Sequence, residues 1–312
     1  MKYGSIVVTF NRKKLLVEAL NSLLNQTVPP TKIILIDNHS DDGTKRMLEQ
    51  QHLLHHPLIE YRYLSQNIGG AGGFSLGMKI AMSKPGLDWV SMSDDDAIFC
   101  PDYFEKLIRF HEQYPDRLIL TGSVYIEDGR LQDDQRNRFL SWNNFRTVEV
   151  PVSEYQGNFE FDQYTFCGVF MSITVIRMVG IADAGFFIWW DDCEYAIRTA
   201  KISKPVNISS ARLIHKTALP SIDSKKEFIP DWRMYYGFRN RIITIQRWSQ
   251  NRFLGLLWLI AFYGRFLIEL CGSFYKGHRK MAIQSYWEAL RDAIQEKEGL
   301  NRNFMPGQKF KD

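Results

Sequence analysis

Three consecutive carboxylates, Asp94, Asp95 and Asp96, follow an apolar, strand-like run at residues 87–93. Two carboxylates about 4 Å apart repel each other by roughly 4 kcal/mol at an effective dielectric constant of about 20, whereas a hard divalent cation converts that repulsion into coordination. Oxygen ligands favour Mg²⁺ or Mn²⁺ over Zn²⁺. The triplet therefore predicts a divalent-metal site. The alternative is a solvated acidic turn before the segment that begins at Pro101.

Short polar side chains follow the first two strand patterns. Thr9, Asn11 and Arg12 come after the first, and a run from Asp37 to Thr44 comes after the second. Such side chains could hydrogen-bond a base and a ribose, although Asx-rich loops before helices are also ordinary capping segments. These two loops are candidates for a nucleotide pocket.

A glycine-rich segment runs from Asn67 to Phe74, with glycine at four of the five positions 69–73. Glycine lets a ligand approach the backbone closely, and the amides at a helix start attract an anion. The segment lacks the Walker lysine and the GxGxxG spacing, which disfavours a P-loop or dinucleotide fold. It predicts a phosphate or sugar contact instead.

The elements that position these residues alternate between strand and helix. This order predicts βαβ units, an α/β fold and a mostly parallel, Rossmann-like sheet, whose carboxyl edge collects the polar loops. The polar stretch at 133–144 is predicted to be a surface loop or a small insertion. We expect strands at 5–10, 32–37, 59–64, 87–93 and 206–215, and helices at 12–25, after 43, at 72–82, at 191–200 and over most of 232–299.

The chain divides by composition into residues 1–231 and a C-terminal helical region, 232–312. From Arg252 to Asp312 it carries ten Lys or Arg and six Asp or Glu, an excess of four that equals the whole net charge of +4. An apolar run at 253–263 is too short to span a bilayer and is followed by basic residues at 276–280. This pattern predicts an interfacial membrane helix. The alternatives are a core helix or a contact within a homo-oligomer.

Other features of the composition limit the cellular compartment and the kinds of binding partner that we expect. The four cysteines are dispersed and form no CxxC pair, so they predict neither a disulfide framework nor a zinc site. No apolar signal segment precedes the first strand pattern, so we expect a cytoplasmic protein. Because the basic excess is confined to the apolar tail, nucleic-acid binding is not expected.

Together these motifs resemble those of GT-A-fold, family 2 inverting glycosyltransferases. The matching residues are Thr9-Phe10-Asn11-Arg12, the run after Asp37 and the aspartate triplet. The glycine-rich segment, the later Trp190-Asp191-Asp192-Cys193-Glu194-Tyr195 and a downstream His215 are similar to the galactofuranosyltransferase-like branch. The resemblance covers about residues 5–241.

The resemblance implies roles for individual residues. Asp192 would be the catalytic base, and Asp94, Asp96 and His215 would hold Mn²⁺ or Mg²⁺, although a lone histidine is more often structural. Trp189 and Trp190 could stack on an acceptor sugar or fill the core. The residues implied in substrate and nucleotide binding are Thr9, Asn11, Arg12, Asp37, Asn67, Gly70, Gly72, Gly73, Asp95, Trp189, Trp190 and Asp191.

The implied reaction is transfer of galactofuranose from UDP-galactofuranose to a hydroxyl of a lipid-linked or oligosaccharide acceptor, at the inner membrane face, in bacterial surface glycan synthesis. The same fold could instead use dTDP-rhamnose, or the chain could be a catalytically silent nucleotide-binding scaffold. Asp191 and Asp192 lie at a predicted helix start, where the helix dipole favours their anionic forms and weakens them as bases. Both could also be simple N-cap residues.

Overall fold

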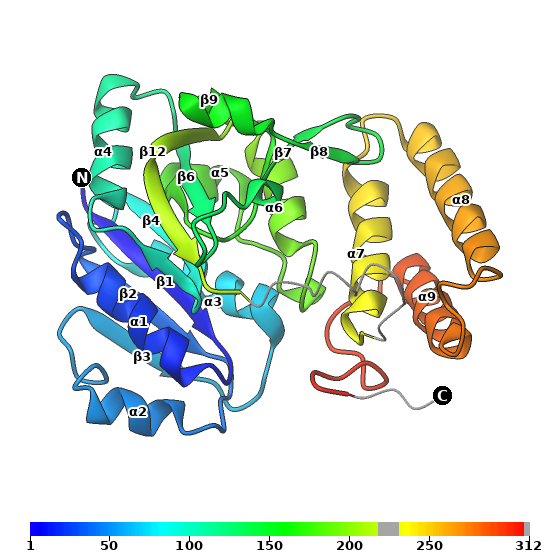
Figure 1. The fold of residues 1–312 in the computed structure, drawn as a ribbon, viewed down its shortest axis with the longest axis horizontal. Helices are drawn as coiled ribbons and strands as arrows, with labels where there is room; N and C mark the ends of the chain where they lie inside the picture. Colours follow the sequence, from blue (N-terminus) through cyan, green and yellow to red (C-terminus); the bar gives the residue numbers. More distant parts are fainter. Residues whose placement is uncertain (218–230, 309–312) are drawn as a thin grey trace. The chain divides into compact units, whose positions relative to one another are not determined.

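The computed structural model describes residues 1–217 and 231–308. The chain forms two compact units, shown in Figure 1. The first unit comprises residues 1–138, 148–184 and 192–217. The second comprises residues 139–147 and 185–191 together with the C-terminal part from 218 onward, of which 231–308 are described. Two short loops from within the first part of the sequence therefore belong to the second unit.

Strands and helices alternate as the sequence predicted, and the α/β class is confirmed (Figure 1). The strands are β1 Tyr3–Thr9, β2 Lys32–Asp37, β3 Ile59–Tyr63, β4 Trp89–Asp94, β5 Ala97–Phe99, β6 Ile119–Tyr125, β7 Arg136–Phe139, β8 Thr147–Glu149, β9 Phe159–Glu160, β10 Gln163–Tyr164, β11 Val169–Ser172 and β12 Val206–His215. The helices are α1 Lys13–Leu24, α2 Thr44–Gln50, α3 Gly69–Ser83, α4 Tyr103–Gln113, α5 Ile173–Val179, α6 Asp191–Thr199, α7 Arg233–Trp248, α8 Arg252–Glu269 and α9 Arg279–Ile294.

Among the described residues, nine strands form the main sheet in the order β3-β2-β1-β4-β11-β6-β12-β5, with β9 beside β12. The block β3-β2-β1-β4 is parallel, and β12 runs parallel to β6. Strand β11 lies antiparallel between β4 and β6. The predicted parallel core is present, and β1, β2 and β4 end together at one edge.

Side chains alternate between two buried faces along β1. Tyr3 and Val7 pack in one apolar cluster with residues of α1 and α4, whereas Ile6 and Val8 pack in another with residues of α3. All seven β1 residues are buried, as expected for a strand of a parallel sheet covered on both faces. The charged and larger polar side chains lie beyond the end of this strand, where the candidate site is.

Two local predictions differ from the structure. Helix α3 begins at Gly69, so the glycines lie in its first turns, where a Cβ on Gly73 would stand 2.7 Å from Val8 Cγ1. The glycines therefore let α3 pack directly on β1. The stretch at 133–144, expected to be a surface loop or a small insertion, is not entirely at the surface. It contains β7, which lies between β10 and β8 in a small three-stranded sheet, and a fully buried Arg136. Arg136 donates hydrogen bonds to the carbonyls of Gly122 and Cys167. These carbonyls take the place of the water molecules that would solvate an arginine at the surface.

The second unit is mainly helical. Helix α7 packs against both α8 and α9, and its Tyr235 stacks on Phe304 with ring centroids 4.6 Å apart. No helix within residues 1–217 or 231–308 is long and apolar enough to cross a bilayer.

Candidate active site

The aspartate triplet lies where β4 ends and the chain turns into β5. Because β1 pairs in parallel with β4, Thr9 lies beside it and its hydroxyl donates to Asp95 Oδ2 at 2.6 Å. The Arg12 guanidinium lies 3.2 Å from Asp95 Oδ1 and also donates to Asp96 Oδ2. The loop after β1 and the triplet therefore form one polar cluster.

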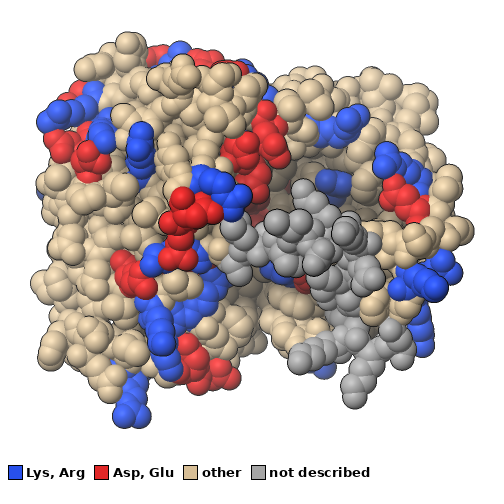
Figure 2. Space-filling view, in the orientation of Figure 1, with Lys and Arg blue, Asp and Glu red and all other residues tan. Residues whose placement is uncertain are grey.

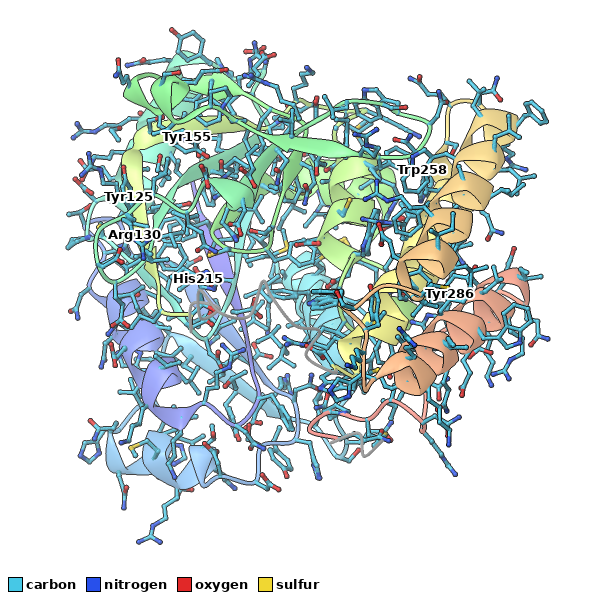
Figure 3. All side chains as sticks on the ribbon, turned by 45° about the vertical axis from the view of Figure 1, so that its right-hand side comes forward. Tyr125, Arg130, Tyr155, His215, Trp258 and Tyr286 are labelled. Atoms are coloured by element: carbon cyan, nitrogen blue, oxygen red, sulfur yellow. The ribbon has the colours of Figure 1, made fainter. Side chains whose placement is uncertain are left out.

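His215 joins this cluster from the end of β12, where Figure 3 labels it. Antiparallel pairing with β5 sets His215 opposite Ala97, and its Nε2 lies 3.3 Å from Asp96 Oδ1. Its Nδ1 lies 2.8 Å from the side-chain oxygen of Gln132, which orients the ring. Burial alone would lower the pKa of His215, but the adjacent Asp96 raises it overall.

The three carboxyl groups have different proton affinities. Burial, followed by the charges of Asp96 and Asp95, raises the pKa of Asp94 to about 7. Burial also raises the pKa of Asp95 to about 6, against the opposing effect of Arg12. Burial would raise the pKa of Asp96 as well, but His215 and Arg12 outweigh it and lower that pKa below its usual value. The cluster thus holds one firmly ionised carboxylate beside two that resist ionisation.

The carboxylate oxygens and the imidazole nitrogen of this cluster are ligand atoms that suit a divalent cation. Asp96 Oδ1 is buried without a hydrogen bond of ordinary geometry, His215 Nε2 faces it, and a cation would favour the ionised form of Asp94. In the part of the chain that the structure describes, however, no three His, Cys, Asp or Glu side chains converge as a metal-holding group. Arg12 instead lies on the Asp95 and Asp96 carboxylates as their counter-charge.

The loops after β1 and β2 are tied to each other. The Asn11 side-chain oxygen accepts from the backbone amide of Asp41 at 2.8 Å, and the backbone amide of Asn11 donates to Ser40 Oγ. Asp37 is fully buried and accepts from the Tyr61 hydroxyl at 2.7 Å and from the Ser40 amide. The predicted nucleotide-binding residues therefore lie in one rigid, hydrogen-bonded loop pair.

The glycine-rich segment is fixed to the same edge. Asn38, directly after β2, accepts from the Ile68 amide at 2.8 Å and donates to the Gly69 carbonyl. Asn67 accepts from the Gly69 amide, which supports the first turn of α3. An added Cβ on Gly72 would contact Ile68, whereas Gly70 has open space around it. Gly70 is thus the glycine in this segment most open to a ligand.

Asp192 begins helix α6 together with Asp191. Its carboxylate accepts from the Cys193 amide at 2.7 Å. Burial raises the pKa of Asp192 to about 6, although the backbone amides of the helix start oppose this effect. The sequence argument considered only the helix start, so it expected a weaker base than the structure supports.

A chain of contacts links α6 to the segment beside the triplet. Burial raises the pKa of Cys167, the nearby Asp96 and Asp94 raise it further, and Arg136 opposes this effect. The preceding Phe166 packs against Tyr195, near the middle of α6, with ring centroids 6.0 Å apart. These contacts tie helix α6 to the chain that leads into β11 next to β4.

Trp189 and Trp190 belong to the second unit and lie against helix α7. Trp189 is 42% exposed and has the Arg233 guanidinium 5.1 Å from its ring centroid. Trp190 is half-buried, with Arg241 4.7 Å from its ring centroid. Trp189 therefore keeps surface for a ligand, and neither ring is simply core.

Two residues of the site have no motif that marks them in the sequence. Gln132 lies in a run that resembles a loop, and Tyr61 lies in β3. Each contacts a predicted residue through its side chain, Gln132 through His215 and Tyr61 through Asp37. Asn38 lies within the run after Asp37, but its hydrogen bonds to Ile68 and Gly69 are evident only from the structure.

Residues 5–179 match the model of the family described as Glycosyl transferase family 2. The galactofuranosyltransferase GlfT1 of Mycobacterium tuberculosis is 28% identical over 205 residues, which cover 64% of this chain and 65% of that enzyme. The alignment thus spans less than two thirds of that relative's length. The dTDP-rhamnosyl transferase RfbF of Shigella flexneri is 22% identical over 255 residues, covering 78% of this chain and 79% of that enzyme.

The fold is similar to that of GalNAc-T7, solved in a crystal with UDP, GalNAc and Mn²⁺. The TM-score is 0.64 at 14% sequence identity, and the match covers 95% of this chain and 57% of that one. At this identity the likeness concerns the fold alone, and it confirms the expected GT-A architecture.

Proposed function

This chain belongs to glycosyl transferase family 2, and from that premise we propose that it moves galactofuranose from UDP-galactofuranose to a hydroxyl group of a glycan or lipid-linked acceptor. The observation that carries the proposal is the polar cluster at the carboxyl edge of the sheet, where Thr9, Arg12 and His215 surround Asp95 and Asp96. Similarity to a named galactofuranosyltransferase supports the choice of donor.

In the proposed reaction, the acceptor oxygen attacks the anomeric carbon from the face opposite the nucleotide. Asp192 takes the hydroxyl proton onto a carboxylate oxygen as the new carbon–oxygen bond forms. The bond from the anomeric carbon to UDP breaks, and UDP leaves with that electron pair, so the configuration inverts. A base with a pKa of about 6 is ionised at neutral pH and still binds a proton better than an ordinary aspartate.

We assign the donor to the loops of the first unit. Asn11 and Asn67 would face the nucleoside, while the buried Asp37 holds the loop behind them through Ser40, and the open space at Gly70 would admit the diphosphate or the sugar. Asp94, Asp96 and His215 would hold Mn²⁺ or Mg²⁺, which would neutralise charge on the departing diphosphate. The Arg12 side chain is half exposed and its guanidinium already lies on the carboxylates of this cluster, so it can reach the same phosphates.

The acceptor is assigned to Trp189 and Trp190, which directly precede Asp191 and Asp192. Trp189 presents an exposed aromatic surface on which a sugar ring can stack. Because these tryptophans are adjacent in sequence to Asp191 and Asp192, an acceptor hydroxyl bound beside their rings would lie near the proposed base.

The second donor candidate is dTDP-rhamnose. The rhamnosyl transferase relative aligns over more of this chain than the galactofuranosyltransferase does, although at lower identity. Donor choice depends on contacts to the base and the sugar, which these alignments leave open.

A panel of nucleotide sugars decides the donor. The protein is incubated with Mn²⁺, phenyl-capped glycan acceptors and each of UDP-galactofuranose, UDP-galactopyranose and dTDP-rhamnose. We expect UDP-galactofuranose to be turned over at least about 100 times faster than the others, because a site built to hydrogen-bond one donor rejects analogues strongly. Turnover of dTDP-rhamnose without UDP-galactofuranose would overturn the assignment, and mass spectrometry of the products identifies the sugar added.

We further propose that the protein works at the cytoplasmic face of a membrane, with α8 lying on anionic lipid. Only one stripe of α8 is buried, namely Gly255, Leu259, Tyr263 and Phe266. The rest of the helix exposes seven large apolar side chains, each between 46% and 75% exposed: Phe253, Leu254, Leu256, Leu257, Ile260, Leu267 and Ile268.

The charges around α8 favour an anionic surface. Arg252 and Arg265 lie on the helix itself, and Lys276, Arg279 and Lys280 follow it. In Figure 2, charged side chains are scattered over the first unit, whereas the upper surface over α8 is largely uncharged. An apolar helix face with basic neighbours suits a bilayer with acidic headgroups.

Vesicle flotation tests this membrane face. We expect wild-type protein to float with phosphatidylglycerol vesicles, to float less as salt rises, and to stay behind with phosphatidylcholine vesicles. The double variant Ile260→Glu with Ile268→Glu should bind at least about tenfold more weakly, because it places charges on the apolar face. Met178→Glu, at an equally exposed residue of α5, is the matched control.

Two results would contradict the membrane assignment. The first is equal flotation of the double variant and the control. The second is a change from dimer to monomer, measured by light scattering, that the double variant causes without lipid, since this would assign the face to a second copy of the chain.

A further inference from the structure

The loop before Asp192 has an unusual backbone. Phe187, Trp189 and Trp190 have φ values of 64°, 62° and 69°, in the left-handed region that residues with a Cβ seldom adopt. Three such residues within four positions are not stable by themselves, so surrounding contacts must impose the conformation. The loop runs from Gly185 into Asp191, the first residue of α6.

One side chain of α7 contacts three of the six carbonyl groups of the Gly185–Trp190 loop. The fully buried Asn240 directs its amide nitrogen to the carbonyl oxygens of Phe186, Ile188 and Trp189, at 2.9, 3.0 and 2.8 Å. Buried carbonyls require such donors, because water cannot reach them. Asn240 therefore holds the turn that carries both tryptophans.

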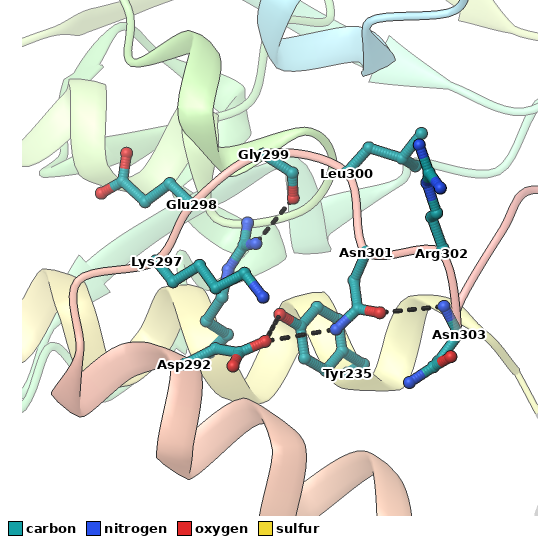
Figure 4. Close-up of a pocket in the computed structure, with 10 residues that line it drawn as sticks. Tyr235, Asp292, Lys297, Glu298, Gly299, Leu300, Asn301, Arg302 and Asn303 are labelled. Carbon is teal, nitrogen blue, oxygen red and sulfur yellow. Dashed lines mark hydrogen bonds between the residues drawn. The ribbon is translucent and has the colours of Figure 1, made fainter.

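Arg239 orients Asn240 and anchors the beginning of the loop. Its Nε donates to Asn240 Oδ1 at 2.9 Å, and its Nη2 donates to the carbonyls of Gly185 and Phe186. Its Nη1 donates to the carbonyl of Gly299, at the rim of a cavity of about 330 Å³ in the second unit (Figure 4). Each of the three guanidinium nitrogens of this arginine thus donates a hydrogen bond within the protein.

The same face of α7 supports the tryptophan rings. Arg233, Gly237 and Arg241 recur at helical spacing, and a Cβ on Gly237 would lie 3.0 Å from Trp189 Cε3. Arg233 lies over Trp189 and Arg241 over Trp190. One helix face therefore fixes both the backbone and the rings of the loop.

We propose that Arg239 and Asn240 are positioning residues of the transfer reaction, which fix the Gly185–Trp190 loop so that the acceptor platform and the Asp191-Asp192 helix start keep one geometry. The inference rests on the proposed function of Asp192, but the clamp itself is a property of the second unit. It predicts that loosening the loop lowers the rate of transfer without weakening nucleotide binding, because the donor loops belong to the first unit.

The test compares Asn240→Ala and Asn240→Asp with Thr244→Val. Thr244 is the matched control, since it lies one turn further along α7, is fully buried, and its hydroxyl has no hydrogen-bond partner among the described residues. Asn240→Asp keeps the shape of the side chain but removes the amide donors, which separates hydrogen bonding from packing.

Three measurements are made on each folded variant. Hydrogen–deuterium exchange should rise at least about tenfold in residues 185–190 of both Asn240 variants and stay unchanged in β1 and β4. The Kd for UDP should stay within about threefold. The kcat for transfer should fall about 100-fold with the donor KM unchanged, as a misplacement of about 1 Å in a site typically causes.

The outcomes separate the clamp from the function. Unchanged loop exchange in Asn240→Ala, or wild-type exchange in Asn240→Asp, would overturn the clamp, as would a full kcat with a loosened loop. If the wild-type protein binds UDP but transfers no sugar, faster loop exchange in the Asn240 variants would support the clamp while the proposed function is refuted. An effect of Thr244→Val equal to that of Asn240→Ala would show general destabilisation of α7 and overturn the inference.

Discussion

Replacing Asp192 with asparagine is expected to lower kcat for sugar transfer by about 10³-fold, while the Kd for UDP stays within about twofold. A positioned general base contributes about 10²–10⁴-fold to such a reaction, and asparagine cannot accept the hydroxyl proton. The carboxylate is the only group that changes, so the helix start and its hydrogen bond to the Cys193 amide are preserved in kind. Single-turnover kinetics with the donor found by the sugar panel measures the loss.

The pH dependence gives this prediction a second readout. Burial raises the pKa of Asp192 to about 6, so wild-type kcat should be level above pH 7 and fall tenfold per unit below about pH 6, where the base becomes protonated. The residual activity of Asp192→Asn should lack this acidic limb.

The matched control is Asp102→Asn, at the start of α4, which should keep wild-type kcat. Full activity in Asp192→Asn would reject the base assignment. Absence of transfer in the wild-type protein, with UDP binding intact, would instead favour the scaffold alternative.

The sheet and its edge were readable from the sequence because burial imposes a simple pattern. Strand β2 was placed at its observed bounds, since five of its six residues are buried and polar residues follow at once. The bounds of β12 were also placed correctly. Alternating strands and helices then required a parallel core, so the loops of β1, β2 and β4 had to meet at one edge.

The separate roles of the glycines in the glycine-rich segment could not be predicted from the local sequence. Its composition predicted exposed amides at a helix start, but composition cannot tell an open glycine from one pressed against a strand. Gly73 and Gly77 are needed for contact with Val8 and Ile6 of β1, whereas Gly70 is open. Only the packing of α3 on the sheet separates the two roles.

The burial of several polar residues could not be predicted from the sequence either. Arg136, Arg239 and Asn240 each look like surface residues by type, and each is buried with its donors on backbone carbonyls. Their partners are distant in the sequence, so no motif marks them.

Asp96→Asn is expected to remove the dependence of UDP binding on Mn²⁺. Asp96 is the carboxylate held ionised in the cluster, and its buried Oδ1 faces His215 Nε2. An amide at this position loses both the negative charge and an oxygen donor, so the affinity for Mn²⁺ should fall by at least about 100-fold. Electron paramagnetic resonance of free Mn²⁺ and calorimetry with UDP measure this without any turnover.

Two further variants make the result specific to the proposed site. Gln132→Ala should weaken Mn²⁺ binding by about tenfold, because Gln132 orients the His215 ring without contacting the ion. Asp88→Asn, just before the opposite end of β4, should leave Mn²⁺ binding unchanged, since the Asp88 carboxylate accepts from the Lys2 amide and lies away from the triplet. If wild-type protein binds UDP equally well with and without Mn²⁺, and Asp96→Asn behaves the same way, the Asp95 and Asp96 carboxylates have Arg12 as their working counter-ion and the metal assignment is wrong.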